Sequence, residues 1–203
     1  MNKEPSQIIL KVQEFTRVFK AHLDDIHWQD PKYKRIQNAF DRILAFEDPA
    51  SVVVSPGLKP VSRHWEQVLS SAGQGRLSNM INILEGLTPC LEWLDAPHYR
   101  GEDVDREFLE NYGCFELVGD HGLIRDDRVT LGCILLSPEI YFPLHAHKGV
   151  ELFYVVSGRG TWHMDKGPII SLPRETHILI PSSRMHAFWS LGSDPMAAVY
   201  ICG

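Results

Sequence analysis

The stretch PLHAHKGVELFYVVSGRGTW, residues 143–162, holds the features on which the fold prediction depends. His145 and His147 are two residues apart, Glu151 follows them, and an apolar run then leads to Gly158. Strand residues two apart project from the same face, so both imidazoles would point to one side if they lie on one strand. An antiparallel neighbour that begins at Glu151 would bring its carboxylate beside them. The stretch therefore predicts a buried β-hairpin that carries metal ligands.

A fourth ligand is expected from a separate part of the chain. The segment IPSSRMHAF contains a strand end, the turn residue Pro181 and then His186. His177 is a competitor for the same position, but the spacing from Pro181 favours His186. Imidazoles and one carboxylate make a site suited to one divalent transition metal, with Zn(II), Fe(II), Mn(II), Ni(II) and Co(II) all open. The predicted metal ligands are His145, His147, Glu151 and His186.

The composition and periodicity of the sequence change near Gly113. Before this residue apolar side chains recur at helical spacing, and after it short segments rich in β-branched and aromatic residues alternate with turn residues. We expect an α+β protein in which a helical N-terminal region, residues 1–112, packs on a C-terminal β-barrel or sandwich, residues 113–203. About 90 residues of β chain form a small unit, so a core shared with the helices is expected. The expected helices cover residues 6–23, 36–44, 62–69, 77–84 and 103–112.

Composition limits the classes of partner. The 203 residues are 44% hydrophobic and 23% charged, as in an ordinary soluble globular protein. The net charge of −6 argues against nucleic acid, because phosphate binding needs a basic surface. No signal peptide or membrane span is expected, and the scattered cysteines predict free thiols in a reducing compartment, so the prediction is a cytoplasmic protein without a membrane partner. A homodimer is left open. The cysteines are Cys90, Cys114, Cys133 and Cys202.

The pattern HxHxxxExxxxxxG, followed by PxxxxH, resembles the two motifs of the cupin superfamily. The resemblance implies that the β region is a cupin barrel, which is a double-stranded β-helix or jelly roll. It also implies a metal site, because three imidazoles and a carboxylate inside a dry barrel would otherwise need hydrogen-bond partners. The residues that form the motifs are His145, His147, Glu151, Gly158, Pro181 and His186.

A closer resemblance covers more of the chain. The run from LEWLD to SGRGTW, within residues 91–162, is similar to the cupin-type dimethylsulfoniopropionate lyases. The similar pieces include ELVG, the approach YFPLHAH to the metal ligands, and SGRGTW after the glutamate. The resemblance implies a small carboxylate substrate and a metal-dependent β-elimination that splits dimethylsulfoniopropionate into dimethyl sulfide and acrylate.

Two aromatic positions depart from the pattern of that family. The family often has a tyrosine two residues after the metal-binding glutamate and another three residues before the first histidine. This chain has Phe153 and Phe142 there, and phenylalanine cannot transfer a proton. We therefore expect the catalytic groups to be Tyr141, Tyr154 or His163, with Tyr200 as a weaker candidate. Tyr141 has the same strand parity as His145 and His147, and Pro143 can introduce a bulge that redirects it.

A sulfonium group has no hydrogen-bond donor, so aromatic faces would have to hold it by cation–π attraction of roughly 0.5–2 kcal/mol each. The alternative interpretation is that each aromatic ring belongs to the hydrophobic core of the barrel and does not bind substrate. The remaining histidines are expected to be structural or at the surface. They are His22, His27, His64, His98 and His121. The predicted substrate-binding residues are Phe142, Phe153, Trp162 and Trp189.

Three functions compete at this point. The first is a metal-dependent lyase that acts on dimethylsulfoniopropionate or a related small carboxylate. The second is an Fe(II)-dependent dioxygenase, since cupin barrels support both chemistries and a fold does not decide between them. The third is a non-catalytic protein that binds a small acid.

Overall fold

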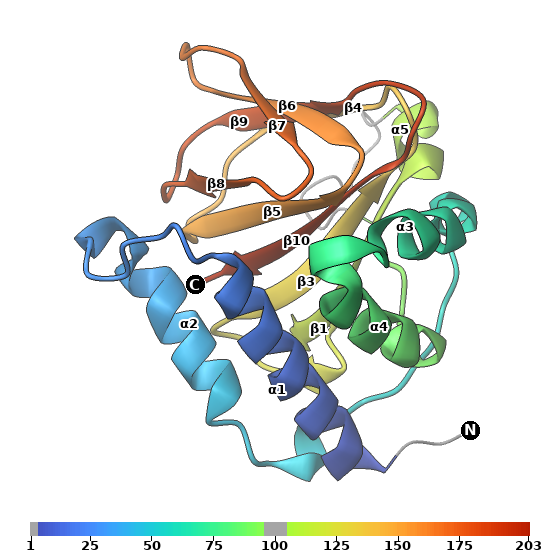
Figure 1. Cartoon of the computed structure of the whole chain (residues 1–203), viewed down its shortest axis with the longest axis vertical. Helices are drawn as coiled ribbons and strands as arrows, with labels where there is room; N and C mark the ends of the chain where they lie inside the picture. Colours follow the sequence, from blue (N-terminus) through green and yellow to red (C-terminus); the bar gives the residue numbers. More distant parts are fainter. Residues whose placement is uncertain (1–3, 96–104) are drawn as a thin grey trace.

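The computed structural model describes residues 4–95 and 105–203, and within these ranges helices precede strands, as predicted (Figure 1). His98 and the first residues of the helix predicted over 103–112 lie outside the described residues. Short 3-10 turns introduce several helices; one of them covers Pro60–His64. The α-helices are α1 (Pro5–His22), α2 (Lys34–Leu44), α3 (Trp65–Ala72), α4 (Ser78–Leu87) and α5 (Arg106–Asn111).

The strands form two sheets that face each other. One has six strands in the order β2-β1-β3-β10-β5-β8, and the other has four in the order β4-β9-β6-β7. All pairings are antiparallel except the short one between β1 and β2. The strands are β1 (Tyr112–Gly119), β2 (Ile124–Arg125), β3 (Thr130–Leu136), β4 (Tyr141–His145), β5 (Glu151–Ser157), β6 (Arg159–Met164), β7 (Ile170–Pro173), β8 (His177–Ile180), β9 (His186–Ser190) and β10 (Met196–Cys202).

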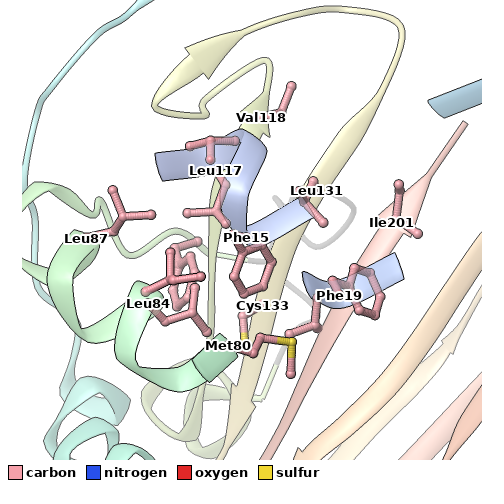
Figure 2. Close-up of a cluster of buried hydrophobic side chains, with 14 of the residues drawn as sticks. Phe15, Phe19, Met80, Leu84, Leu87, Leu117, Val118, Leu131, Cys133 and Ile201 are labelled. Carbon is pink, nitrogen blue, oxygen red and sulfur yellow. The ribbon is translucent and has the colours of Figure 1, made fainter. Parts of the chain in front are cut away.

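Helices cover the outer face of the six-stranded sheet (Figure 1). Phe15 and Phe19 on α1 and Met80 on α4 are fully buried and pack toward that sheet (Figure 2). Burial of such a side chain stabilises the fold by about 1.5–3 kcal/mol. The sheet contributes Leu117, Val118, Leu131, Cys133 and Ile201 to the same cluster (Figure 2).

A second apolar cluster fills the space between the two sheets, and strand alternation decides which residues reach it. On β5, Leu152 and Tyr154 belong to the cluster under the helices, whereas Phe153 belongs to the cluster between the sheets. This division follows from the two-residue period of a strand. The α+β class and the cupin barrel predicted from the sequence are confirmed.

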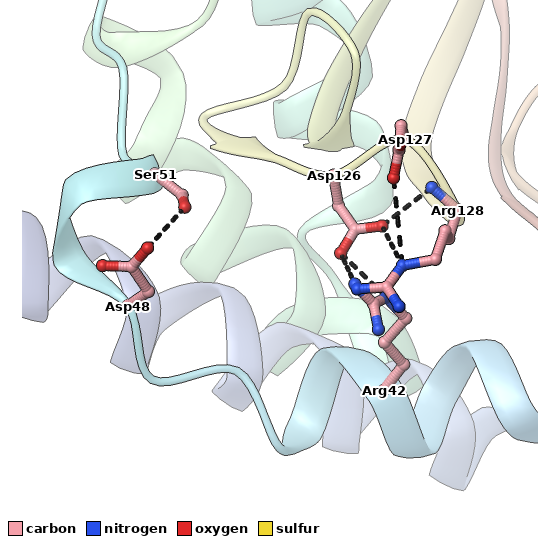
Figure 3. Close-up of polar contacts among 6 residues, drawn as sticks. All are labelled: Arg42, Asp48, Ser51, Asp126, Asp127 and Arg128. Atoms are coloured by element: carbon pink, nitrogen blue, oxygen red, sulfur yellow. Dashed lines mark hydrogen bonds and ion pairs between the residues drawn. The ribbon is translucent and has the colours of Figure 1, made fainter.

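An ion pair ties the helical layer to the turn between β2 and β3 (Figure 3). Nε of Arg42 lies 2.8 Å from Oδ2 of Asp126, whose side chain is only 3% exposed. The other carboxylate oxygen accepts the backbone N–H of Arg128 at 2.8 Å. Several charge-assisted bonds thus satisfy a buried carboxylate at the junction of α2 and the sheet.

Two local predictions were wrong. Residues 143–162 do not form a hairpin that joins His145 to Glu151, because β4 belongs to the four-stranded sheet and β5 to the six-stranded sheet. His147 does not share a strand with His145, since β4 ends at His145.

Among the described helices, none has both the length and the apolar content required to cross a membrane.

Candidate metal centre

Three histidines meet at one end of the space between the sheets. His145 ends β4, His147 follows two residues later, and His186 begins β9. The pairing of β4 with β9 places His145 opposite His186, with ring centroids 4.1 Å apart. One ring nitrogen from each of the three histidines lies within 4.8 Å of the other two. Such a group of imidazoles is suited to a divalent metal ion.

Backbone carbonyls orient two of the rings. Nδ1 of His145 lies 2.9 Å from the carbonyl oxygen of Pro143, and Nδ1 of His186 lies 2.9 Å from that of Arg184. A carbonyl oxygen only accepts, so the ring N–H must donate in both contacts. Each neutral ring therefore carries its proton on Nδ1 and presents the lone pair of Nε2, which is how metal-binding histidines are commonly positioned.

A carboxylate completes the group. Oε2 of Glu151 lies 2.9 Å from Nε2 of His147 and 3.8 Å from Nε2 of His186. The hydrogen bond that the Glu151 carboxylate accepts from the His147 ring raises the pKa of His147, and burial opposes this effect. Three imidazoles and a carboxylate fit a divalent first-row metal ion by donor chemistry. The structure thus brings together the four residues predicted as ligands.

A pocket of about 240 Å³ opens beside the histidines. No lysine or arginine is among the described residues that line it, and its acidic residues are Glu116 and Glu151. A metal ion held by the histidines would supply the positive charge that a small carboxylate in this pocket can bind. The lining consists of Tyr112, Cys114, Glu116, Thr130, Ile134, Phe142, His145, His147, Gly149, Glu151, Phe153, Phe188, Tyr200 and Cys202.

Tyr141 does not face the pocket, so its predicted inward direction was wrong. The register of β4 against β9 shifts between Phe142 and His145, and Phe142 consequently joins His145 in the pocket lining. Tyr141 is 37% exposed, and its ring centroid lies 4.3 Å from that of Trp189. The ring centroid of His163 lies 5.9 Å from that of Trp189. All three side chains, Tyr141, Trp189 and His163, are therefore away from the pocket.

Tyr154 and Trp162 are also placed elsewhere. Tyr154 faces the helices, with ring centroids 6.0 Å from both Phe19 and His22. Trp162 is fully buried between the sheets, where it stacks on Phe188 at 5.0 Å. Of the aromatic residues predicted to bind substrate, Phe142 and Phe153 line the pocket, and Trp162 and Trp189 do not.

The pocket contains polar groups that sequence reasoning missed. Tyr112, Cys114 and Glu116 project from β1, a strand that the sequence predicted to begin only after Tyr112. Their two-residue spacing was the available signal. Tyr200, which the sequence offered only as a weaker candidate, also lines the pocket and lies on β10 opposite Phe153 on β5. Burial raises the pKa of Tyr112 and Tyr200 well above 10 and that of Cys114 to about 12.

Solved structures share the fold. A structure reported with the dimethylsulfoniopropionate lyases RdDddP and RnDddQII superposes with a TM-score of 0.62 at 21% identity, covering 84% of this chain and 89% of that one. The lyase DddQ from Ruegeria pomeroyi gives a TM-score of 0.59 at 18% identity, covering 86% and 92%.

Curated sequences point the same way. A putative dimethylsulfoniopropionate lyase, DddL, from Cereibacter sphaeroides is 30% identical over 129 residues, or 64% of this chain and 53% of that protein. DddQ from Ruegeria pomeroyi is 25% identical over 101 residues, half of each chain. This chain spans about half the length of the curated relatives it matches. The dimethylsulfoniopropionate lyase family model matches residues 34–198, well over half of the sequence, and the chain belongs to that family.

Proposed function

We propose that the protein is a metal-dependent carbon–sulfur lyase that cleaves dimethylsulfoniopropionate, or a closely related small carboxylate, into dimethyl sulfide and acrylate. The observation that carries this proposal is the meeting of three imidazoles and Glu151 at one end of an aromatic pocket whose described lining residues include no lysine or arginine. Family membership supports the same reaction.

His145, His147, His186 and Glu151 would hold the metal ion. Zn(II), Fe(II), Mn(II), Ni(II) and Co(II) all accept these ligands, and cells select among them by availability. When bound, the ion supplies Lewis acidity to the substrate carboxylate and favours the anionic form of nearby acids.

The residues of the chain would orient the substrate and accept its proton. Phe142, Phe153 and Phe188 form apolar walls of the pocket, against which the carbon chain of the substrate would lie. A base removes the proton next to the carboxylate, the electron pair of that C–H bond forms the double bond of acrylate, and dimethyl sulfide leaves with the electrons of the C–S bond. We assign the proton acceptor to the phenolate of Tyr200, with that of Tyr112 as the alternative, because both side chains line the pocket and a bound metal ion would favour their anionic form.

A second candidate function is the binding of a small acid without turnover. The specific observation in its favour is that Phe142 and Phe153 both line the pocket, so the chain lacks an ionisable group at two positions beside the histidines. Such a protein would bind the acid through the same metal ion and release it unchanged.

The test is release of dimethyl sulfide. The protein is stripped with a chelator, reloaded with each of the five metals in turn, mixed with dimethylsulfoniopropionate and assayed by gas chromatography. The lyase proposal expects dimethyl sulfide and acrylate in equal amounts with at least one metal, and none from His147→Ala. Binding of substrate with no product under any metal would favour the second candidate.

Three further expectations stay predictions. All four cysteines lack a disulfide bond, which supports a reducing compartment such as the cytoplasm. A homodimer remains a prediction that light scattering can test. The division at residues 1–112 and 113–203 is kept as a description of regions; one apolar cluster contains residues from both, which supports a common folding unit.

A further inference from the structure

Glu116 stands on the wall of the pocket in a row of residues that crosses four strands. It lies opposite Gly132 on β3, which lies opposite Tyr200 on β10, which in turn lies opposite Phe153 on β5. A Cβ atom at Gly132 would come within 3.0 Å of the Tyr200 ring. The absence of a side chain at Gly132 thus leaves room for the Tyr200 ring over β3.

The carboxylate of Glu116 is held in place but has no lysine or arginine partner among the residues that the structure describes. Its Oε2 accepts the backbone N–H of His121 at 2.9 Å, which holds the group at the end of β1. Among the described residues, no lysine or arginine lies within 4.0 Å of it. Burial is the main cause that raises the pKa of Glu116, and the hydrogen bond from the His121 backbone opposes it. A partly buried carboxylate of this kind gains most from a cation supplied by a ligand.

The pocket therefore has two ends of opposite charge when a metal ion is bound. The ion, held by the histidines and Glu151, would provide the positive end, and Glu116 on β1, separated from Glu151 on β5 by strands β3 and β10, provides the negative end. Aromatic rings of Phe142, Phe153 and Tyr200 line the space shared by these ends. A molecule with a carboxylate at one end and a positively charged, fully alkylated group at the other matches this order of charges.

We propose that Glu116 selects the cationic end of an onium carboxylate, so that the site prefers a sulfonium or quaternary ammonium acid over a neutral acid of the same shape. This inference rests on the proposed function, because it needs the substrate carboxylate at the histidine end. It adds an electrostatic contribution from one residue to the cation–π attraction of the aromatic walls.

The experiment compares two ligands that differ by a single charge. Trimethylammonium propionate and its neutral isostere, in which carbon replaces nitrogen, are titrated calorimetrically into the zinc-loaded protein. We expect the cationic acid to bind at least about tenfold more tightly than the isostere, which corresponds to about 1.4 kcal/mol. In Glu116→Gln this preference should fall to about threefold or less, with the affinity for the neutral isostere unchanged.

Two controls separate charge from structure. Glutamine can still accept the His121 N–H, so the zinc content and circular dichroism of Glu116→Gln should match those of the wild type. Glu85→Gln removes a glutamate at the exposed surface of α4 and should leave the preference intact.

The outcomes also separate this inference from the lyase proposal. A full preference for the cation in Glu116→Gln, or equal wild-type affinity for both acids, would overturn the role of Glu116 and leave the lyase proposal standing. Failure of the wild type to bind either acid would overturn both. A preference that depends on Glu116, without dimethyl sulfide release from dimethylsulfoniopropionate, would support Glu116 and overturn the lyase. Loss of turnover in Glu116→Gln with the cation preference retained would identify Glu116 as the base and contradict the inference.

Discussion

Phe153 and Tyr200 are neighbours on adjacent strands, and they present different chemistry to the same pocket. Their ring centroids lie 6.0 Å apart, and only Tyr200 carries a hydroxyl group. Phe153 occupies a position where the family often has a tyrosine. The phenol of Tyr200 lies next to it, on the paired strand β10. At the scale of single residues, the phenolate form of Tyr200, which a bound metal ion would favour against the effect of burial, is the simplest proton acceptor.

Tyr200→Phe should reduce dimethyl sulfide release by about 10²-fold or more, because loss of a general base typically has an effect of this size. The apolar ring remains, so zinc content should not change. Tyr141→Phe is the matched control, since Tyr141 lies on the outer face of β4, and it should keep the wild-type rate. Equal rates in Tyr200→Phe and the wild type would remove Tyr200 from the mechanism.

The sequence predicted the residues of the candidate metal site better than those of the rest of the pocket. His145, His147, Glu151 and His186 could be identified because their side chains and spacing are distinctive. The direction of Tyr141 could not, because the irregularity between Phe142 and His145 depends on pairing with β9. A one-residue change of register turns a side chain to the other face.

At the scale of elements, the tight connection between β5 and β6 depends on Gly158. Its φ is +67°, a region that favours glycine, and a Cβ atom there would lie 2.7 Å from the carbonyl oxygen of Pro195. Gly192 also has a positive φ, of +86°, but a Cβ atom would meet nothing within 4 Å. A substitution at Gly192 therefore introduces backbone strain alone, whereas one at Gly158 introduces backbone strain together with a steric clash.

Gly192→Ala should lower the free energy of unfolding by about 1–2 kcal/mol, the cost of a left-handed conformation. Gly158→Ala should lower it by roughly 1 kcal/mol more, because the new methyl group also displaces the chain at Pro195. Urea denaturation of both variants measures the difference. Equal losses would mean that the neighbouring backbone yields without cost.

The order of elements was predictable, but their pairing was not. Periodicity located α1 and α2 closely, since each buries one apolar stripe. The hairpin predicted around Lys148 and Gly149 failed because β4 pairs with β9, more than 40 residues away in sequence, and local patterns do not reveal such partners. Glu151 still reaches His147, but it does so from the opposite sheet.

At the scale of the whole molecule, the helices and the barrel share one core, and His22 lies at their junction. It is the last residue of α1 and packs on Tyr154 of β5. Burial is the main cause that lowers its pKa below 6.5, and Arg76 adds to the effect. The folded protein therefore favours the neutral ring.

Acidification should weaken the fold through this histidine. The unfolded chain binds a proton near pH 6.5, whereas folded His22 binds one only at lower pH. Its contribution to stability is therefore complete above about pH 6.5 and is lost as the pH falls below that value. The free energy of unfolding, measured in urea at about pH 7.5 and about pH 5.5, should decrease less in His22→Gln than in the wild type. The same decrease in both proteins would show that His22 titrates normally.

The decisive measurement for the metal centre is the metal content of the dialysed protein after loading with a divalent metal, determined by mass spectrometry. We expect one ion per chain in the wild type and in His163→Ala, whose histidine lies outside the pocket, and little or none in His186→Ala or Glu151→Ala. A full equivalent of metal in His186→Ala, or its loss in His163→Ala, would contradict the proposed centre.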